Sequence, residues 1–396
     1  MTVLGLSDFS LVTCLGSGRA NTMSALRGGR SGLLPCRFDT LPLAAYVGEV
    51  PGLDATQLTG EWAPFDCRNN RLAALALAQD EFLRTVAQAR ARYGAARIGV
   101  FLGTSTSGIL QTETAYRHRD SSGALPPGFN YARTHNTYAL GHFVRDYLRL
   151  SGPAFVVSTA CAATSKVFVS AARMIEAGLC DAAIVGGADS LCATTLFGFH
   201  SLGVVAEGPC RPFDAARNGI SIGEAAGFAL LEKPGDQHGP DSVLLLGAGE
   251  SSDAYHMSSP DPDGKGAARA MQLALQAAGL APSEIDYINL HGTATLAGDA
   301  SEDRAVSHLF GNKIPCSSTK GFTGHTLGAS GIVAAIISAL AIQGGFLPGS
   351  PHTNHVDPEF SSAYALRGRT ARLQRVLSNA FGFGGVNCSL VLGRAA

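Results

Sequence analysis

Apolar residues in this chain fall into two kinds of segment, which alternate from one end to the other. Short runs rich in β-branched residues, such as RIGVFL at 97–102, predict buried strands, whereas strongly apolar longer segments, such as GIVAAIISALAI at 331–342, predict helices. Strands are expected near 2–6, 97–102, 155–157, 181–187, 221–231, 285–290, 313–317, 375–379 and 386–392. Helices are expected near 21–27, 71–93, 162–177, 267–278, 301–310 and 331–342. This alternation favours an α/β fold whose parallel strands are covered by helices on both faces.

The stretch 156–177 (VVSTACAATSKVFVSAARMIEA) is the most informative one. A β-branched run leads through small residues to Cys161, and apolar residues at helical spacing follow, among them Val167, Met174 and Ile175. This order places Cys161 at a helix N-terminus, where unpaired N–H groups and the helix dipole favour a thiolate. A lone cysteine is more often an inert core residue, so a role for Cys161 as a nucleophile depends on residues elsewhere in the chain.

The two halves of the chain resemble each other. One apolar strand leads into Gly-Thr-Ser-Thr at 103–106 and another into Gly-Thr-Ala-Thr at 292–295, and after each come a Ser-Thr pair, a loop of small residues and a long apolar helix. The stretch 107–140 is an excursion in the first half, suited to lining a pocket or a dimer contact. The charged, Gly- and Pro-rich stretch 232–241 predicts a boundary. We therefore expect an N-terminal half at 1–240 and a C-terminal half at 241–396, with the active site where they meet.

The composition narrows the classes of function. Charged residues make up only 15% and the net charge is −1, so the overall charge favours neither nucleic acid nor a membrane surface. The nine cysteines are scattered and never spaced C-x-x-C, which argues against a disulfide framework and a zinc site. The N-terminus lacks the pattern of a signal peptide, and we expect no segment with about 18 uninterrupted apolar residues. A cytoplasmic protein is expected.

Four motifs with reactive residues occur along the chain. They are TACAAT around Cys161, HGTATLAGDASE from His291, STKGFTGHTLGASG with His325, and NAFGFGGVN at 379–387, and RPFDAARNGISIGEAAG at 211–227 is a further match. Both histidines occupy corresponding strand-end or turn positions, which converge in a duplicated fold. With these motifs the chain resembles, over essentially its whole length, a β-ketoacyl-acyl-carrier-protein synthase of the elongating type within the thiolase superfamily. The resemblance implies a thiolase-like, pseudo-duplicated, five-layered αβαβα fold.

The resemblance also implies an acyltransferase reaction, a decarboxylative Claisen condensation. An acyl group held as a thioester on Cys161 would be joined to malonyl-acyl carrier protein, in the elongation of a fatty acid or a related polyene or polyketide. His291 and His325 would hold the enolate oxygen, and the backbone N–H groups of Cys161 and Phe381 would hold the tetrahedral oxyanion. Lys320 would pair with Glu302 and keep the histidines neutral or correctly oriented.

Substrate-binding residues are implied in the same way. Thr293 and Thr295 match threonines that hydrogen-bond the phosphopantetheine arm of the carrier protein. Phe199 and Phe381 match a pair of side chains that gate the acyl pocket, and Phe383, in the same Gly-rich turn, is a further candidate for substrate binding.

The resemblance implies partners as well. Arg68 and Arg71 match a basic patch at which an acidic acyl carrier protein docks. A dimer is expected, and the sequence does not decide between a homodimer and a heterodimer. No metal and no resident cofactor are expected, since the substrates arrive on the phosphopantetheine of the carrier protein.

Two other functions are weighed against this one. A thiolase acting on coenzyme A esters would use a second cysteine late in the chain; Cys388 lies beyond the Gly-rich turn, and a second histidine, His325, favours decarboxylation. A noncatalytic partner subunit of another ketosynthase would lack the nucleophile, which is present here as Cys161. The sequence departs from the family pattern at Leu296, where a proline is usual, and this could alter the stiffness of the loop.

Overall fold

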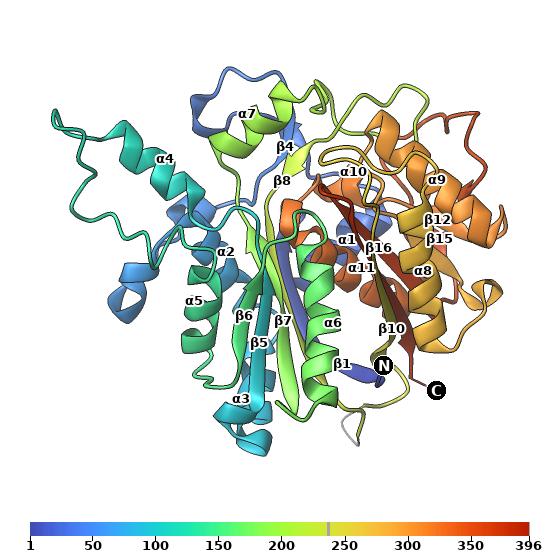
Figure 1. The fold of residues 1–396 in the computed structure, drawn as a ribbon, viewed down its shortest axis with the longest axis horizontal. Helices are drawn as coiled ribbons and strands as arrows, with labels where there is room; N and C mark the ends of the chain where they lie inside the picture. Colours follow the sequence, from blue (N-terminus) through green and yellow to red (C-terminus); the bar gives the residue numbers. More distant parts are fainter. Residues whose placement is uncertain (236–237, 396) are drawn as a thin grey trace.

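A computed structural model gives the fold of the chain and describes residues 1–235 and 238–395 (Figure 1). The main strands of the first half are β1 (Leu4–Thr13), β5 (Ile98–Gly103), β6 (Ala154–Val157), β7 (Ala182–Asp189) and β9 (Ala225–Glu232). Its helices are α1 (Gly18–Gly28), α2 (Arg68–Leu77), α3 (Phe82–Tyr93), α4 (Ile109–Arg117), α5 (Ala139–Tyr147), α6 (Ala163–Glu176) and α7 (Ala193–Ser201). Short strands β3 (Leu34–Pro35), β4 (Tyr46–Gly48) and β8 (Ile222–Gly223) form a separate small sheet.

The second half repeats this alternation of strands and helices. Its main strands are β10 (Val243–Ser252), β11 (Tyr287–Asn289), β12 (Pro315–Ser317), β14 (Ala363–Tyr364), β16 (Arg375–Gly382) and β17 (Val386–Arg394). Its helices are α8 (Lys265–Ala278), α9 (Leu296–Phe310), α10 (Lys320–Thr323) and α11 (Ser330–Gly344). Every segment predicted from the sequence overlaps an observed element of the same type. The elements that were not predicted include helices α4, α5, α7 and α10 and strands β3, β4, β10 and β14.

The pairing of the strands shows the duplication. In the first half the order is β1, β9, β7, β5, β6, with two antiparallel pairs followed by two parallel pairs. In the second half the order β10, β17, β16, β11, β12 has the same succession of antiparallel and parallel pairs. An antiparallel contact between β1 and β10, with Leu4 opposite Leu245, joins the halves. The repeat predicted from the Gly-Thr-Ser-Thr and Gly-Thr-Ala-Thr segments is confirmed, because they follow the corresponding strands β5 and β11.

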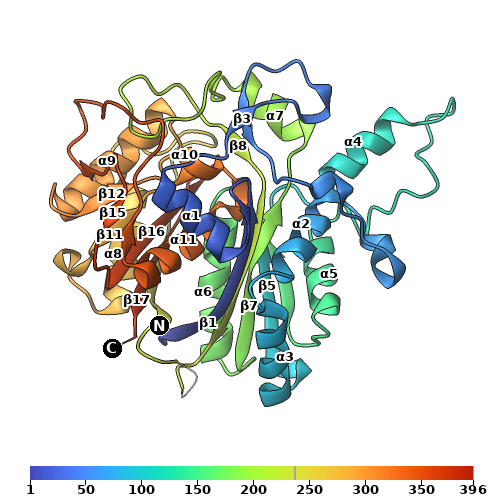
Figure 2. The ribbon, with the colours of Figure 1, turned by 180° about the vertical axis from the view of Figure 1, so that it is seen from behind.

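Helices form the central and the outer layers (Figures 1 and 2). The central helices α6 and α11 contact each other, α6 packs on β5 and β7, and α11 packs on β16 and β17. On the outer faces, α2 and α5 cover the strands of the first half, and α8, backed by α9, covers β10 and β17. The layers therefore run α, β, α, β, α, which confirms the predicted fold class.

The central helix α11 is apolar on all sides because it is enclosed on all sides. Every residue from Ser330 to Ile342 is buried. The 18 residues Leu327–Gly344 are long and apolar enough to cross a membrane by length and composition alone. Ser330, Ser338 and Gln343 interrupt the segment, so it is not the uninterrupted apolar run that the sequence analysis expected to be absent. In the folded chain 89% of this segment is buried inside the protein, as in a core helix.

The segment 71–93, predicted as one helix, is two helices. Helix α2 ends at Leu77 and α3 begins at Phe82, and between them Asp80 (φ 55°) and Glu81 (φ 65°) adopt the left-handed conformation. Alanine and leucine spacing continues across the break, so the apolar pattern alone does not reveal it. After the break, α3 packs on β1 and β5.

The predicted boundary stretch 232–241 joins the ends of two strands. Strand β9 ends at Glu232 and β10 begins at Val243, while Asp236 and Gln237 lie outside the described residues. The division at residue 240 stays a prediction. The excursion 107–140 contains α4 and an irregular segment that extends from the body of the molecule (Figure 1).

The close packing of the central helices yields a first testable prediction. A Cβ atom at Gly331 of α11 would lie 2.3 Å from Ser165 Oγ and 2.5 Å from Ser165 N of α6. We expect Gly331→Ala to lower the free energy of unfolding by about 1–3 kcal/mol through overpacking, measured by urea denaturation. Gly198 in α7 is the matched control, because no atom lies within 4 Å of its Cβ position and alanine there should stabilise the helix by about 0.5–1 kcal/mol. Equal stability of wild type and Gly331→Ala would contradict this packing.

Candidate active site

A cavity of about 310 Å³ opens between the two halves at the ends of the strands. Its walls include Cys161, His291 and His325, and also Thr293 and Thr295. One side-chain atom of each of the first three residues, the sulfur and two ring nitrogens, lies within 4.8 Å of the other two. The structure thus brings together three residues that are 130 and 34 positions apart in the chain, as the sequence predicted for the floor of the site.

Cys161 lies between the end of β6 and the start of α6. The preceding residue, Ala160, has a positive φ of 48°, and this sharp turn presents the sulfur to the cavity. The side chain is 5% exposed, and the backbone N–H of Phe383 donates to the sulfur. The helix-terminal position of Cys161 agrees with the sequence prediction.

The prediction of a lowered thiol pKa was wrong. Burial raises the pKa of Cys161 to about 11, because a thiolate in this dry position loses its hydration. The charge of Lys320 and the N–H of Phe383 act in the opposite direction and only reduce this rise. The resting site therefore holds a neutral thiol.

The hydrogen bonds of His325 fix its tautomer. Its Nδ1 accepts the backbone N–H of Leu327 at 3.1 Å and lies 3.0 Å from Ser330 Oγ. Since an Nδ1 that accepts an amide hydrogen carries no proton, the neutral ring carries its proton on Nε2. Leu327 adopts φ 51°, a left-handed conformation that aims its N–H back at the ring.

His291 has the same tautomer for a different reason. Lys320 Nζ lies 3.3 Å from His291 Nδ1 and also donates to the carbonyl oxygen of His291. An ammonium group has no acceptor, so Nδ1 accepts and Nε2 carries the proton. Burial, and next the charge of Lys320, hold the pKa of both histidines well below the usual range. The two rings, 5.4 Å apart and nearly perpendicular, are therefore neutral N–H donors.

Lys320 and Glu302 do not form the predicted direct ion pair. Within the described part of the chain, no carboxylate oxygen lies within 4.0 Å of Lys320 Nζ. Glu302 instead accepts the backbone N–H groups of His291 at 2.8 Å and Gly292 at 2.7 Å, and the side-chain amide of Asn379 at 3.0 Å. The two charges are thus coupled across the backbone of His291, with Lys320 on its carbonyl and Glu302 on its N–H.

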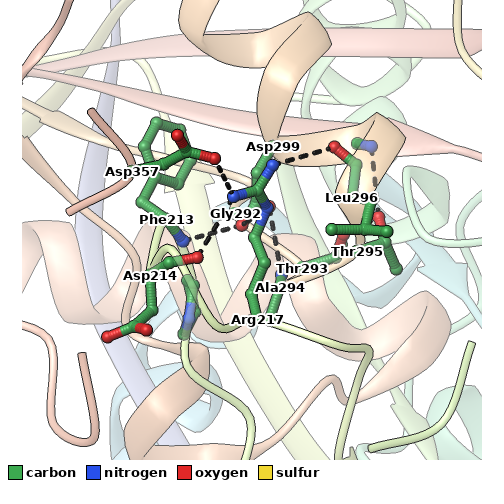
Figure 3. Close-up of polar contacts among 12 residues, drawn as sticks. Phe213, Asp214, Arg217, Gly292, Thr293, Ala294, Thr295, Leu296, Asp299 and Asp357 are labelled. Carbon is green, nitrogen blue, oxygen red and sulfur yellow. Dashed lines mark hydrogen bonds and ion pairs between the residues drawn. The ribbon is translucent and has the colours of Figure 1, made fainter. Parts of the chain in front are cut away.

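The loop that carries Thr293 and Thr295 is held by hydrogen bonds to the first turn of α9 (Figure 3). The two threonine hydroxyls lie 2.9 Å apart, and Thr295 caps α9 by accepting the N–H of Gly298 at 3.2 Å. Between them Ala294 (φ 66°) donates its N–H to Asp299 at 3.0 Å. Both threonines line the cavity, as expected of residues that contact an extended substrate.

A buried arginine completes this anchor and was not predicted. Arg217 donates to the carbonyl of Leu296 at 3.3 Å and to Asp357 at 2.6 Å (Figure 3). Asp299, whose pKa burial raises to about 7, also accepts the N–H of Phe213 at 2.7 Å. Arg217 and Asp299 belong to the motifs RPFDAARNGISIGEAAG and HGTATLAGDASE, so their membership in these motifs was the available signal.

In the Gly-rich turn, Phe383 makes the two contacts that were predicted for Phe381, one through its backbone N–H and one through its ring. The N–H that reaches the sulfur belongs to Phe383, whereas Phe381 is paired in β16 opposite Asn387. The ring of Phe383 lies 5.7 Å from that of Phe199, so the pair that could act as a gate is Phe199 and Phe383. The ring of Phe381 lies 5.8 Å from His291. Two phenylalanines separated by one glycine match the motif equally well, and only the register of the turn distinguishes them.

Arg68 and Arg71 do not form an exposed basic patch. Arg68 is 3% exposed and donates to Glu224 at 2.6 and 2.7 Å, to Glu49 at 3.1 Å and to Asp54. Arg71 donates to both carboxylate oxygens of Asp66 at 2.6 and 2.5 Å. Their charges are neutralised within the chain, and the docking role predicted for them is not compatible with this arrangement.

The chain is similar to known proteins over most or all of its length. The family descriptions "Beta-ketoacyl synthase, N-terminal domain" and "Beta-ketoacyl synthase, C-terminal domain" match residues 64–236 and 243–354. The 3-oxoacyl-[acyl-carrier-protein] synthase 2 of Vibrio cholerae is 31% identical over 98% of both chains, and that of Rhizobium meliloti is 38% identical over 75% of this chain and 74% of its own. A ketosynthase (ApeO), solved in complex with its chain length factor (ApeC) from Xenorhabdus doucetiae, has a TM-score of 0.89 and 37% identity, covering 100% of this chain and 98% of its own.

The surroundings of Arg68 predict a structural rather than a docking role. Arg68→Ala leaves the fully buried Glu224 without its cation, so we expect a loss of about 3–5 kcal/mol in the free energy of unfolding. Arg71→Ala removes a more exposed pair and should cost about 1 kcal/mol or less. Urea denaturation of the two variants decides the point, and a loss in Arg68→Ala no greater than that in Arg71→Ala would contradict it.

The raised thiol pKa predicts how alkylation depends on pH. Below its pKa the thiolate fraction rises tenfold per pH unit, so inactivation by iodoacetamide should keep accelerating through pH 8.5 and level off near pH 11. The Cys161→Ser variant measures the contribution of the other cysteines. A plateau at or below pH 8.5 would restore the helix-dipole account and refute the dominance of burial.

Proposed function

The chain belongs to the β-ketoacyl synthase family, and from that premise we propose that it is a 3-oxoacyl-acyl-carrier-protein synthase. In this reaction an acyl group on Cys161 is joined to malonyl-acyl carrier protein with loss of CO2, giving a β-ketoacyl-acyl carrier protein. One observation supports it above all: two neutral imidazoles with Nε2 protons share a cavity with one thiol, all within 4.8 Å. An oxygen that gains negative charge beside the thiol would find two donors in place.

The first step is acyl transfer to Cys161. The sulfur attacks the thioester carbonyl of acyl-acyl carrier protein, the bond to the phosphopantetheine sulfur breaks, and the thiol proton of Cys161 ends on the departing thiol. Because burial raises the pKa of Cys161 to about 11, the proton leaves as the new bond forms rather than beforehand. The oxyanion of the tetrahedral intermediate would be held by the N–H groups of Cys161 and Phe383.

The second step generates the carbon nucleophile. Malonyl-acyl carrier protein loses CO2, and the electron pair of the broken C–C bond becomes an enolate whose charge rests on the thioester oxygen. The Nε2–H groups of His291 and His325 donate to this oxygen. Lys320 and burial hold the pKa of both rings low, so each ring keeps one proton as a hydrogen-bond donor and has no second proton to lose to the enolate carbon.

The third step forms the new C–C bond. The enolate carbon attacks the acyl carbonyl on Cys161, the C–S bond breaks, and the sulfur leaves as a thiolate that takes one proton from solvent. The raised pKa of Cys161 favours this return to the thiol. Through all three steps Thr293 and Thr295 would hold the phosphopantetheine arm through their hydroxyls at the cavity wall.

The two alternative functions fit the site less well. Cys388, the second cysteine that a thiolase would require, is fully buried in β17 and is not part of the cavity wall. A noncatalytic partner subunit would not need a thiol beside two histidines. Here Cys161, His291 and His325 lie together, and both ring Nδ1 atoms have hydrogen-bond partners. Synthase activity therefore accounts for more of the arrangement than either alternative.

We propose that the protein acts as a dimer and that acyl carrier protein is its partner. Strand β6 ends the order of the main sheet, and among the described strands only β5 pairs with it. Its four residues, Ala154–Val157, are half-buried although apolar, so a second subunit could cover this edge. A homodimer is our proposal, since one chain supplies the whole reactive set. The absence of a resident cofactor and the cytoplasmic location remain predictions.

The proposed function is tested by measuring decarboxylation and acylation separately in histidine variants. His291→Ala and His325→Ala should each lower CO2 release from radiolabelled malonyl-acyl carrier protein by about 100- to 1000-fold, the usual cost of one lost oxyanion donor. Transfer of an acyl group to Cys161 should fall by less than about tenfold. His308→Ala, an exposed histidine of α9 outside the cavity, is the matched control and should change neither rate.

A Cys161→Ala variant separates the synthase from a noncatalytic partner. The proposal requires condensation to vanish in this variant. Full activity of the Cys161→Ala protein, or equal losses of both half-reactions in the histidine variants, would refute it.

A further inference from the structure

A buried carboxylate connects the cysteine loop and the histidine loop. Asp189, at the end of β7, is 0% exposed and is assigned no role by the motifs or by the proposed reaction. Its Oδ1 accepts four hydrogen bonds, from the N–H and hydroxyl of Thr106, the N–H of Ser105 and the hydroxyl of Thr104, at 2.7–2.8 Å. Its Oδ2 accepts the N–H of Gly328 at 2.5 Å. The two oxygens thus bind groups from different halves of the chain.

The donors on the Oδ1 side lead to Cys161. Strands β5 and β7 are parallel neighbours, with Gly103 opposite Gly187, so their carboxyl ends meet at one edge and Asp189 lies beside the loop that follows β5. In that loop the hydroxyl of Ser105 donates to the carbonyl of Ala160 at 3.4 Å, and Ala160 is the strained residue immediately before Cys161. Asp189 is therefore connected, through its hydrogen bond with Ser105, to the turn that presents the sulfur.

The donor on the Oδ2 side leads to His325. Gly328 follows Leu327, whose N–H holds Nδ1 of His325. The carbonyl of Gly328 accepts the hydroxyl of Thr164 in α6, the helix that follows Cys161, at 2.6 Å. A Cβ atom at Gly328 would lie 2.7 Å from both Asp189 Oδ2 and Ser105 Oγ, so the two loops are in direct contact at this point.

We propose that Asp189 is the positioning residue that fixes His325 relative to Cys161, and that it is needed for decarboxylation and condensation far more than for acylation. Acylation uses Cys161 and backbone N–H groups, which other contacts hold, including α6 and the Gly-rich turn. Enolate formation requires the Nε2 proton of His325 at a fixed distance from the sulfur. This inference rests on the proposed function for its two half-reactions.

An amide cannot replace this carboxylate, which makes Asp189→Asn informative. Asparagine offers one acceptor oxygen and one NH2 group. With the oxygen toward Thr104–Thr106 the NH2 group faces the N–H of Gly328, and with the opposite orientation it faces four donors. One loop is released in either case, because buried donors are left unpaired.

The experiment compares three variants of the full chain. In Asp189→Asn, CO2 release from malonyl-acyl carrier protein should fall by about 100-fold, as expected for a misplaced catalytic group, while acylation of Cys161 falls by less than about fivefold. Gly328→Ala separates the loops and keeps the carboxylate, so it should give the same split, and it tests the proposal if Asp189→Asn does not fold. Asp303→Asn is the matched control: this carboxylate is 3% exposed and accepts two N–H groups and a hydroxyl from Ser361 and Ser362, away from the cavity.

Alkylation of Cys161 supplies a readout that needs no substrate. The rings of His291 and His325 lie within 4.8 Å of the sulfur. Of the charged groups around the thiol, Lys320 lowers its pKa and Asp189 raises it. The apparent pKa for iodoacetamide inactivation should therefore fall in Asp189→Asn and stay at the wild-type value in Gly328→Ala and Asp303→Asn. Equal loss of both half-reactions in Asp189→Asn and Gly328→Ala would overturn the proposal. A wild-type protein that releases no CO2 would instead refute the proposed function.

Discussion

The chemistry of this site depends on what occupies the Nδ1 atoms of two buried imidazoles. Leu327 donates its backbone N–H to His325, and Lys320 donates its ammonium group to His291. With both Nδ1 atoms used as acceptors, each neutral ring must point an Nε2 proton into the cavity. Burial and the positive charge of Lys320 prevent a second proton from binding. The result is a pair of fixed dipoles that, in the proposed reaction, would stabilise negative charge on a substrate oxygen without giving up a proton.

The duplicated architecture delivers these groups to one point. Cys161 follows β6, and His325 lies after β12, the strand that corresponds to β6 in the second half. His291 follows β11, the neighbour of β12 that corresponds to β5. Each reactive residue has a non-glycine residue with positive φ within three positions of it in the chain, namely Ala160, Ala294 or Leu327. Such conformations persist only where surrounding contacts hold them, and here Asp189, Asp299 and the central helices provide those contacts. These contacts therefore hold the three loops in the strained conformations that shape the cavity.

Much of the fold and the centre of the site could be predicted from the sequence. Motif order and family resemblance located Cys161, His291 and His325, and the alternating apolar segments identified most strands and helices. The environment of each side chain could not be predicted in the same way. A motif does not show how deeply its residues are buried. The pKa of the Cys161 thiol was therefore expected to be lowered, whereas desolvation raises it. Arg68 was likewise expected at the surface, whereas it is buried in an ion pair with Glu224. The sequence also does not show the register of a Gly-rich turn. Phe381 was therefore predicted as the backbone donor, whereas the N–H that donates to the sulfur of Cys161 belongs to Phe383.

The state of the two imidazoles can be observed directly. Nitrogen-15 NMR of protein labelled at the histidine rings, with His291 and His325 assigned from single substitutions, distinguishes Nδ1–H, Nε2–H and doubly protonated rings. Both residues should be neutral Nε2–H tautomers at pH 7, and they should remain neutral when the pH is lowered to 6. An imidazolium signal, or an Nδ1 proton on either ring, would contradict the account of how this cavity stabilises negative charge.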